Sequence, residues 1–317
     1  MRVAQIIAPH QTETRKLALP RPGPKQVRVR LEGCGVCGSN LAVWQGRPWF
    51  RYPFDPGAPG HEGWGIVDEL GTQVDNVRAG DRVALLSFRA YAEYDVADAS
   101  ALVSISSDKP VFPGEALGCA INVFRRSDIE KGQTVAIVGI GFLGALLVQL
   151  AAQSGARVIA VSRRPFALEI ARQCGAMETI ALAQAPNAIA RVMELTENLG
   201  CERVIEAAGE QQTLDLAGEL VAVHGRLIIA GYHQDGARRV NMQLWNWRGI
   251  DVVNAHERDP AKCLEGMRAA VEAVARGALE PSPLYTHGFT LGELSDAFRV
   301  LEKRPGDFLK AWIRTDV

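Results

Sequence analysis

Two patterns of hydrophobic and polar positions divide the chain. Up to about residue 110, short β-like segments alternate with Gly- and Pro-rich turns; the strand candidates are VRVRLEG (27–33), GWGIVDELG (63–71) and DRVALLSF (81–88). From about residue 121, the apolar runs TVAIVG, RVIAVS, ERVIEAAG and RLIIAGY alternate with helical stretches. This alternation predicts a doubly wound parallel α/β sheet. We therefore expect an α/β domain at 121–258 and a mostly β domain formed by 1–120 with 259–317.

Composition narrows the function classes. The chain has 317 residues, 47% apolar and 22% charged, with a formal net charge of −1. The lack of a basic excess argues against nucleic-acid and anionic-membrane partners. The first residues, MRVAQIIAPHQTETRK, lack the apolar region of a signal peptide, and six scattered cysteines do not form a disulfide framework. We therefore expect a cytoplasmic protein with no membrane partner.

A glycine-rich turn follows the strand candidate TVAIV. In GIGFLG, Gly139, Gly141 and Gly144 have the G-x-G-x-x-G spacing, with Phe142 and Leu143 between the last two. The pattern alone is weak, but here it joins an apolar strand to a helix, which is the context of a dinucleotide-binding turn. The glycines would permit the tight turn, the approach of the diphosphate and close helix packing, with the anion at the helix N-terminus. A glycine turn without a ligand is the alternative.

The end of the next strand candidate bears on the choice of nucleotide. Sites for NAD place a carboxylate there, whereas VIAVSRRP has Ser162 at that point, followed by Arg163 and Arg164. A hydroxyl beside guanidinium groups would bind a 2′-phosphate, so we expect NADP(H) to be preferred over NAD(H). A solvated arginine pair that opens a helix is the alternative. Two later strand ends, at Gly209 and Gly231, could border the nicotinamide half.

The stretch CGVCGSN places Cys34 and Cys37 three positions apart. A redox pair would open a helix after a strand, and a zinc knuckle would need a second CxxC, which is absent. Together with PGHEGWGIV, GDRV (80–83), EALGCA (115–120), GIGFLG, VIEAAG and FTLGELSDAF, the turn resembles the zinc-dependent medium-chain dehydrogenases of the alcohol and polyol group. The resemblance covers nearly the whole chain and implies a Rossmann coenzyme domain beside a GroES-like catalytic domain.

The resemblance also implies a metal centre. It gives Cys37 and His61 as ligands of a catalytic zinc and places Glu62 in its inner shell. Thiolate and imidazole suit zinc, and catalytic sites use three protein ligands. Polyol-type members use a glutamate as the third ligand, which matches Glu115 here, whereas other members use a nearby cysteine, which matches Cys119. The alignment of EALGCA favours Glu115. The second cysteine, Cys34, is expected to be a small buried residue.

Neighbouring positions match the family only in part. Ser39 stands where members keep a hydroxyl that accepts the substrate proton. Asn40 replaces an aspartate that supports the metal-bound histidine, although an amide can still accept that hydrogen bond. Ala42 stands in place of a relay histidine. Trp44 is the best candidate among the following aromatic residues to line a substrate pocket, with simple packing as the alternative.

Many members carry four clustered cysteines after the GDRV strand. This chain has none there, so we expect one catalytic zinc per chain and no structural zinc. The function implied is hydride transfer between NADP(H) and an alcohol or carbonyl substrate, a small molecule. The alternatives are a zinc-idle enone or quinone reductase and a catalytically idle nucleotide-binding sensor. A homo-oligomer, dimer or tetramer, is usual in the family and is expected here.

Overall fold

The computed structural model describes residues 1–106, 108–182 and 185–315. By its internal contacts the chain divides into unit 1, Met1–Gly118 with Asp259–Val317, and unit 2, Cys119–Arg258. The borders expected from the sequence were 120/121 and 258/259. Helix α2 (Gly114–Ser127) runs from unit 1 into unit 2.

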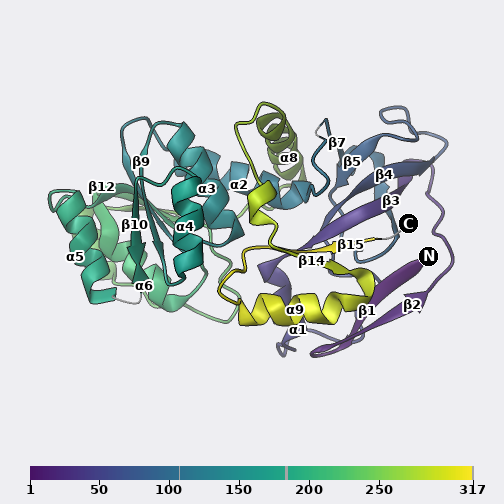
Figure 1. Ribbon diagram of the computed structural model, residues 1–317, viewed down its shortest axis with the longest axis horizontal. Helices are drawn as coiled ribbons and strands as arrows, with labels where there is room; N and C mark the ends of the chain where they lie inside the picture. Colours follow the sequence, from purple (N-terminus) through teal and green to yellow (C-terminus); the bar gives the residue numbers. More distant parts are fainter. Residues whose placement is uncertain (107, 183–184, 316–317) are drawn as a thin grey trace. The chain divides into compact units, whose positions relative to one another are not determined.

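Unit 1 is built on β-strands (Figure 1). Strands β1 and β2 form a hairpin, and a larger sheet has the order β14-β15-β3-β4-β5-β7, with β6 also paired to β3. The strands are β1 (Arg2–Ala8), β2 (Gln11–Lys16), β3 (Gln26–Val36), β4 (Glu62–Leu70), β5 (Arg82–Leu85), β6 (Tyr94–Asp98), β7 (Leu102–Ser104), β14 (His287–Thr290) and β15 (Ala311–Arg314). The helical segments are η1 (Gly38–Asn40), α1 (Leu41–Trp44), η2 (Ala99–Ala101), α8 (Pro260–Ala275), η4 (Ser282–Leu284), η5 (Leu291–Glu293) and α9 (Leu294–Lys303).

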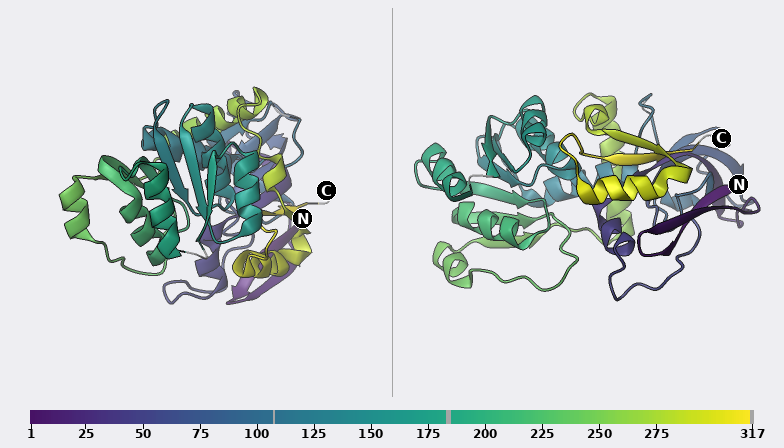
Figure 2. Two further views of the ribbon diagram at one scale, coloured as in Figure 1. Left: turned by 60° about the vertical axis from the view of Figure 1, so that its left-hand side comes forward. Right: turned by 60° about the horizontal axis from the view of Figure 1, so that its bottom comes forward.

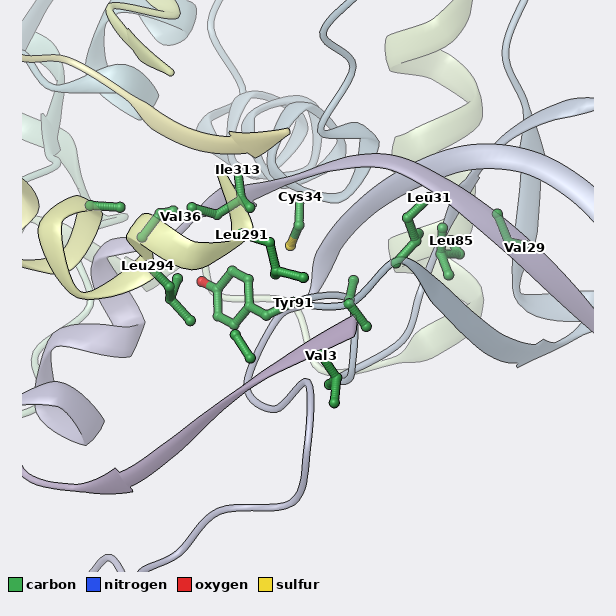
Figure 3. Packing of buried hydrophobic residues seen from close by; sticks show 14 of the residues in the cluster. Val3, Val29, Leu31, Cys34, Val36, Leu85, Tyr91, Leu291, Leu294 and Ile313 are labelled. Carbon is green, nitrogen blue, oxygen red and sulfur yellow. The ribbon is translucent and has the colours of Figure 1, made fainter. Parts of the chain in front are cut away.

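The core of unit 1 follows from the alternation along β3. Val27, Val29 and Leu31 point inward, while the arginines between them are less buried. Figure 3 shows Val29, Leu31 and Cys34 of this strand among apolar side chains from other elements of the unit. Cys34 is fully buried in this cluster, which confirms that it is a core residue.

Trp44 belongs to the core of unit 1 as well. Its side chain is fully buried, stacks on Phe298 with ring centroids 5.1 Å apart, and donates its indole N–H to Glu302 at 3.2 Å. A side chain enclosed in this way cannot line a substrate pocket, so the structure supports the alternative of simple packing for Trp44. Trp44, the first aromatic residue after the CGVCGSN turn, therefore packs in the core of unit 1.

Unit 2 is a six-stranded sheet in which each paired neighbour is parallel, with the order β10-β9-β8-β11-β12-β13. Figures 1 and 2 show helices on both of its faces. Its strands are β8 (Thr134–Val138), β9 (Arg157–Ser162), β10 (Glu178–Ala181), β11 (Cys201–Glu206), β12 (Val221–Ile229) and β13 (Asp251–Asn254). Its helices are α3 (Phe142–Gln153), α4 (Pro165–Gln173), α5 (Ala185–Leu195), α6 (Gln211–Leu220) and α7 (Met242–Arg248). The doubly wound fold predicted from the sequence is confirmed.

The strand order of unit 2 reverses between β8 and β11. From β8 the chain moves outward through β9 and β10, then returns to the other side and continues through β11, β12 and β13. In open parallel sheets, ligands bind at the carboxyl ends of the strands where the order reverses. In the described part of the chain, no helix combines the length and apolar content needed to cross a membrane.

Candidate functional site

The register of β3 and β4 brings Cys37 and His61 together. The strands pair antiparallel with Gly35 opposite Glu62, so the residue that follows β3 and the residue that precedes β4 lie at the same end of the pair. Within the described residues, the ligand atoms of Cys37, His61 and Glu62 all lie within 4.8 Å of one another. Two positions separated by two dozen residues in the sequence thus form one cluster of potential metal ligands.

The orientation of His61 suits a metal ligand. Its Nδ1 lies 2.9 Å from the carbonyl oxygen of Pro59, so the neutral imidazole donates through Nδ1 and keeps a lone pair on Nε2. Burial lowers the pKa of His61, but the Cys37 side chain and the carboxylates of Glu115 and Glu62 raise it to about 10. These surroundings favour a positive charge, and together with a thiol and an imidazole they fit a zinc ion.

The support for His61 differs from what the sequence suggested. The side-chain oxygen of Asn40 accepts from the Tyr91 hydroxyl at 3.1 Å, and its amide nitrogen donates to the Pro59 carbonyl at 3.4 Å. The ring of His61 thus donates to Pro59 and not to Asn40, although an amide at this position could have accepted the bond. Asn40 holds the same carbonyl that His61 uses, and so it supports the ring indirectly.

Glu62 is paired with a lysine that the sequence gave little reason to notice. Lys310 Nζ lies 2.7 Å and 2.6 Å from the two carboxylate oxygens, and the two residues are 5% and 1% exposed. Glycine at position 35 makes room for this pair, because a Cβ there would collide with the Glu62 carboxylate. The only signal in the sequence is a lysine set within the apolar run FLKAWI.

The two candidates for a third ligand lie one helical turn apart on α2. Glu115 is in the first turn, and Cys119 follows four residues later on the same face. The Glu115 carboxylate acts electrostatically on both His61 and Lys310, raising the pKa of each. It lies outside the three-residue cluster defined above. Ser39 is half-buried in η1, the turn that follows Cys37.

The glycines of the turn in unit 2 lie in closely packed or left-handed backbone, except for Gly141. Gly139 has φ +102°, and a Cβ there would lie 2.9 Å from the Cβ of Ala208. Gly144 packs against the Gly139 carbonyl, whereas a Cβ at Gly141 would meet open space. Gly141 is the N-cap of α3, and the N-terminus of a helix is a favourable position for an anion. Phe142 is buried at the start of α3, and Leu143 is half-buried.

The end of β9 carries the polar group expected there. Ser162 is buried, and its hydroxyl accepts from the backbone N–H of Arg164 at 3.3 Å. The Arg164 guanidinium donates to the Ile140 carbonyl in the glycine turn at 3.0 Å. Arg163 is solvent-exposed and lies 3.5 Å from Glu210. The strand end therefore presents a hydroxyl and two guanidinium groups where a carboxylate would otherwise stand.

Gly209 and Gly231 belong to adjacent turns at the same sheet edge. Gly209 has φ +81°, and a Cβ there would meet the backbone of Tyr232 at 2.8–3.1 Å. A Cβ on Gly231 would collide with the backbone of Gly209. Tyr232 is half exposed. The turns after β11 and β12 are thus packed against one another.

Comparisons with known proteins agree with this architecture. Residues 23–119 match the family model described as "Alcohol dehydrogenase GroES-like domain", and residues 143–273 match the model described as "Zinc-binding dehydrogenase". The chain belongs to the zinc-type medium-chain dehydrogenase family. The resemblance read from the motifs is therefore confirmed, and the protein is an oxidoreductase.

The chain is similar to individual dehydrogenases over nearly its whole length. It is 27% identical to an erythritol/L-threitol dehydrogenase of Mycolicibacterium smegmatis, with 90% of each chain covered. It is also 27% identical to the 5-exo-hydroxycamphor dehydrogenase of Pseudomonas putida, with 95% of each covered. A structure described as a zinc-binding dehydrogenase from Sinorhizobium meliloti, bound to NADP, is 25% identical with a TM-score of 0.86, covering 99% of this chain and 98% of that one.

Proposed function

We propose that the dehydrogenase transfers hydride between NADP(H) and an alcohol or carbonyl substrate, with one catalytic zinc per chain. The observation that carries this proposal is the convergence of Cys37, His61 and Glu62 in a chain of the zinc-type family. When bound, zinc would supply Lewis acidity at the substrate oxygen, and the nicotinamide would carry the hydride.

We infer the roles of the chain's own residues from the family resemblance and, for Glu62, from its ion pair. Cys37 and His61 would hold the metal, with Glu115 as the third ligand in preference to Cys119. Glu62 is tied to Lys310, so in this state its carboxylate is held by an ammonium group. The Ser39 hydroxyl would take the proton of the substrate alcohol. With Ala42 in place of a relay histidine, this proton would leave by another route such as bound water.

The preference for NADP(H) is supported by the end of β9. Ser162 brings no negative charge to repel a 2′-phosphate, and Arg163 and Arg164 could bind one through charge-assisted hydrogen bonds. The relative from Sinorhizobium meliloti was solved with NADP. The names of the curated relatives, a tetritol dehydrogenase and a hydroxycamphor dehydrogenase, support an alcohol as the substrate class.

The experiment combines metal analysis with turnover. We expect about one zinc per chain, activity on alcohols or on aldehydes and ketones, higher kcat/KM with NADP(H) than with NAD(H), and loss of activity on chelation. Two zinc ions per chain would contradict the single catalytic site. Enone reduction that survives chelation would contradict the role of the metal, and a metal-loaded protein that turns over none of these substrates would contradict the enzymatic function.

A further inference from the structure

A buried carboxylate lies beneath the sheet edge of unit 2 where the strand order reverses. Glu206, the last residue of β11, is fully buried. One of its oxygens accepts from the backbone N–H groups of Ala208 and Gly209 and from the Thr213 hydroxyl, each at 2.8 Å. The other oxygen lies 3.0 Å from Nε2 of His233. One side chain therefore joins the turn after β11, the start of α6 and the loop after β12.

The proton on His233 is fixed by a third residue. Arg238 Nε donates to His233 Nδ1 at 2.8 Å, and a guanidinium has no acceptor to offer. Nδ1 must therefore accept, so the ring is neutral and carries its proton on Nε2, which donates to Glu206. The hydrogen bonds run in one direction, from Arg238 through His233 to Glu206. Arg238 also donates to the Gly209 carbonyl at 2.9 Å and pairs with Asp235.

The residues held by this chain of hydrogen bonds adjoin the glycine turn. Gly139 fits against Ala208, and Gly209 fits against Tyr232, each at a distance that admits no Cβ without movement. A shift of the turn at 207–209 would therefore be passed to Gly139. The turns after β8, β11 and β12 are the part of the sheet edge on which a dinucleotide lies in this fold class.

We propose that Arg238, His233 and Glu206 form a positioning relay that fixes the turns at 207–209 and 230–233 for the nicotinamide half of the dinucleotide. The proposal rests on the proposed function, because it takes the ligand to be NADP(H). None of the three residues needs to touch the nucleotide: they act through the backbone groups that they hold. The relay depends on one tautomer of His233, which sets it apart from ordinary packing.

The test is a double-mutant cycle read by NADPH binding, measured from the fluorescence of the bound dihydronicotinamide. In Glu206→Gln the amide N–H₂ faces the N–H of His233, so donor meets donor. In Arg238→Met, His233 loses its donor. We expect each single change to raise the Kd about tenfold. In the double variant His233 can move its proton to Nδ1 and accept from Gln, so the Kd should be no higher than in the worse single variant.

Two substitutions of His233 and a matched control sharpen the test. Gln can donate to Glu206 and accept from Arg238, so His233→Gln should keep a Kd close to wild type, whereas His233→Leu should raise it. Arg191→Met removes the same charge from an exposed pair with Glu194 in the same unit and should leave the Kd unchanged. Thermal melting identifies variants that remain folded, and ¹⁵N spectra of histidine-labelled protein report the tautomer, with His233→Gln assigning the signal.

Different results would contradict the relay and the proposed function on which it rests. Independent effects that multiply in the double variant, folded variants that bind NADPH like wild type, or a wild-type His233 protonated on Nδ1 would each overturn the relay. If wild-type protein binds neither NADPH nor NADH, the proposed function falls and the relay falls with it. Binding by wild type together with unchanged variants overturns the relay alone.

Discussion

Lys310 forms a buried ion pair with Glu62, a member of the cluster of potential metal ligands, although 248 residues separate the two in the sequence. Both carboxylate oxygens lie within 2.7 Å of the ammonium nitrogen, and both residues are almost fully enclosed. A buried charge without a partner is costly, since desolvation is no longer offset by attraction. The pair therefore keeps a negative group next to Cys37 and His61 that the fold could not otherwise tolerate.

The first prediction concerns stability. Lys310→Met should lower the free energy of unfolding by about 3–5 kcal/mol, because it leaves the Glu62 carboxylate buried without its counter-ion. The double variant with Glu62→Gln should recover part of this loss. Urea denaturation of the metal-free protein measures both. Lys109→Met, which breaks the exposed pair with Glu280, is the control and should change stability little. Equal effects of the two lysine substitutions would contradict the prediction.

The same pair predicts a dependence on pH. Burial alone would lower the pKa of Lys310, but Glu62 and Cys37 raise it above the ordinary value of 10.5. A raised folded-state pKa gives a contribution that is complete below the unfolded-state value and is lost as the pH rises through the folded-state value. The stability difference between wild type and Lys310→Met should therefore begin to shrink only as the pH rises above the ordinary lysine pKa of 10.5. A difference that falls already near neutral pH would oppose this account.

The candidate metal site could be predicted from the sequence only as far as short motifs reach. Cys37 and His61 stand in recognisable turns, and the pairing of β3 with β4 brings them together. Lys310 belongs to no motif, because its role arises from strand packing across most of the chain. The Pro59 carbonyl escaped notice since backbone groups leave no mark in a sequence pattern. This carbonyl makes the hydrogen bond to His61 that the amide of Asn40 could also have accepted.

In unit 2, too, the sequence predicted local features but not contacts between distant residues. The continuous apolar strands predicted the parallel sheet, and the glycine spacing predicted the tight turn at its edge, because both depend on local sequence. Glu206 was visible only as the end of an apolar strand. Its partners, His233 and Arg238, lie in a loop without periodicity. The sequence could not decide the place of Trp44, because an aromatic residue after the CGVCGSN turn has the same sequence pattern whether it lines a pocket or fills the core.

A third prediction separates the two candidates for the third metal ligand. Glu115→Ala should reduce bound zinc well below one per chain, since the Glu115 carboxylate already acts on His61. Cys119→Ala should retain the metal. Cys263→Ala, on α8, serves as a matched thiol control. Elemental analysis after dialysis gives the zinc content; full occupancy in Glu115→Ala with loss in Cys119→Ala would reverse the assignment.

The preference for the cofactor is tested at the end of β9. Ser162→Asp should lower the ratio of kcat/KM for NADP(H) over NAD(H) about ten- to a hundredfold, because one charge-assisted hydrogen bond of about 1.5–3 kcal/mol is replaced by repulsion of the 2′-phosphate. Arg163→Gln should lower the ratio less, since its side chain is exposed. Arg172→Gln, on the exposed surface of α4, is the control. A ratio that does not respond to Ser162→Asp would remove the argument for NADP(H).

The paired cysteines of the CGVCGSN turn should differ sharply in reactivity. Burial raises the pKa of Cys34 well above its usual value, and its thiol donates to the Gly35 carbonyl at 3.3 Å. Cys37 is half-buried and belongs to the metal cluster. Because the thiolate is the reactive form, iodoacetamide at pH 8 should modify Cys37 in chelator-treated protein while Cys34 stays unmodified until the chain unfolds. Added zinc should protect Cys37.

Cys201, whose pKa burial raises to about 12, provides an internal standard for an enclosed thiol. Peptide mapping by mass spectrometry follows all three sites at once; equal rates at Cys34 and Cys37 in folded protein, or no protection by zinc, would contradict the assignment of one cysteine to the core and the other to the metal.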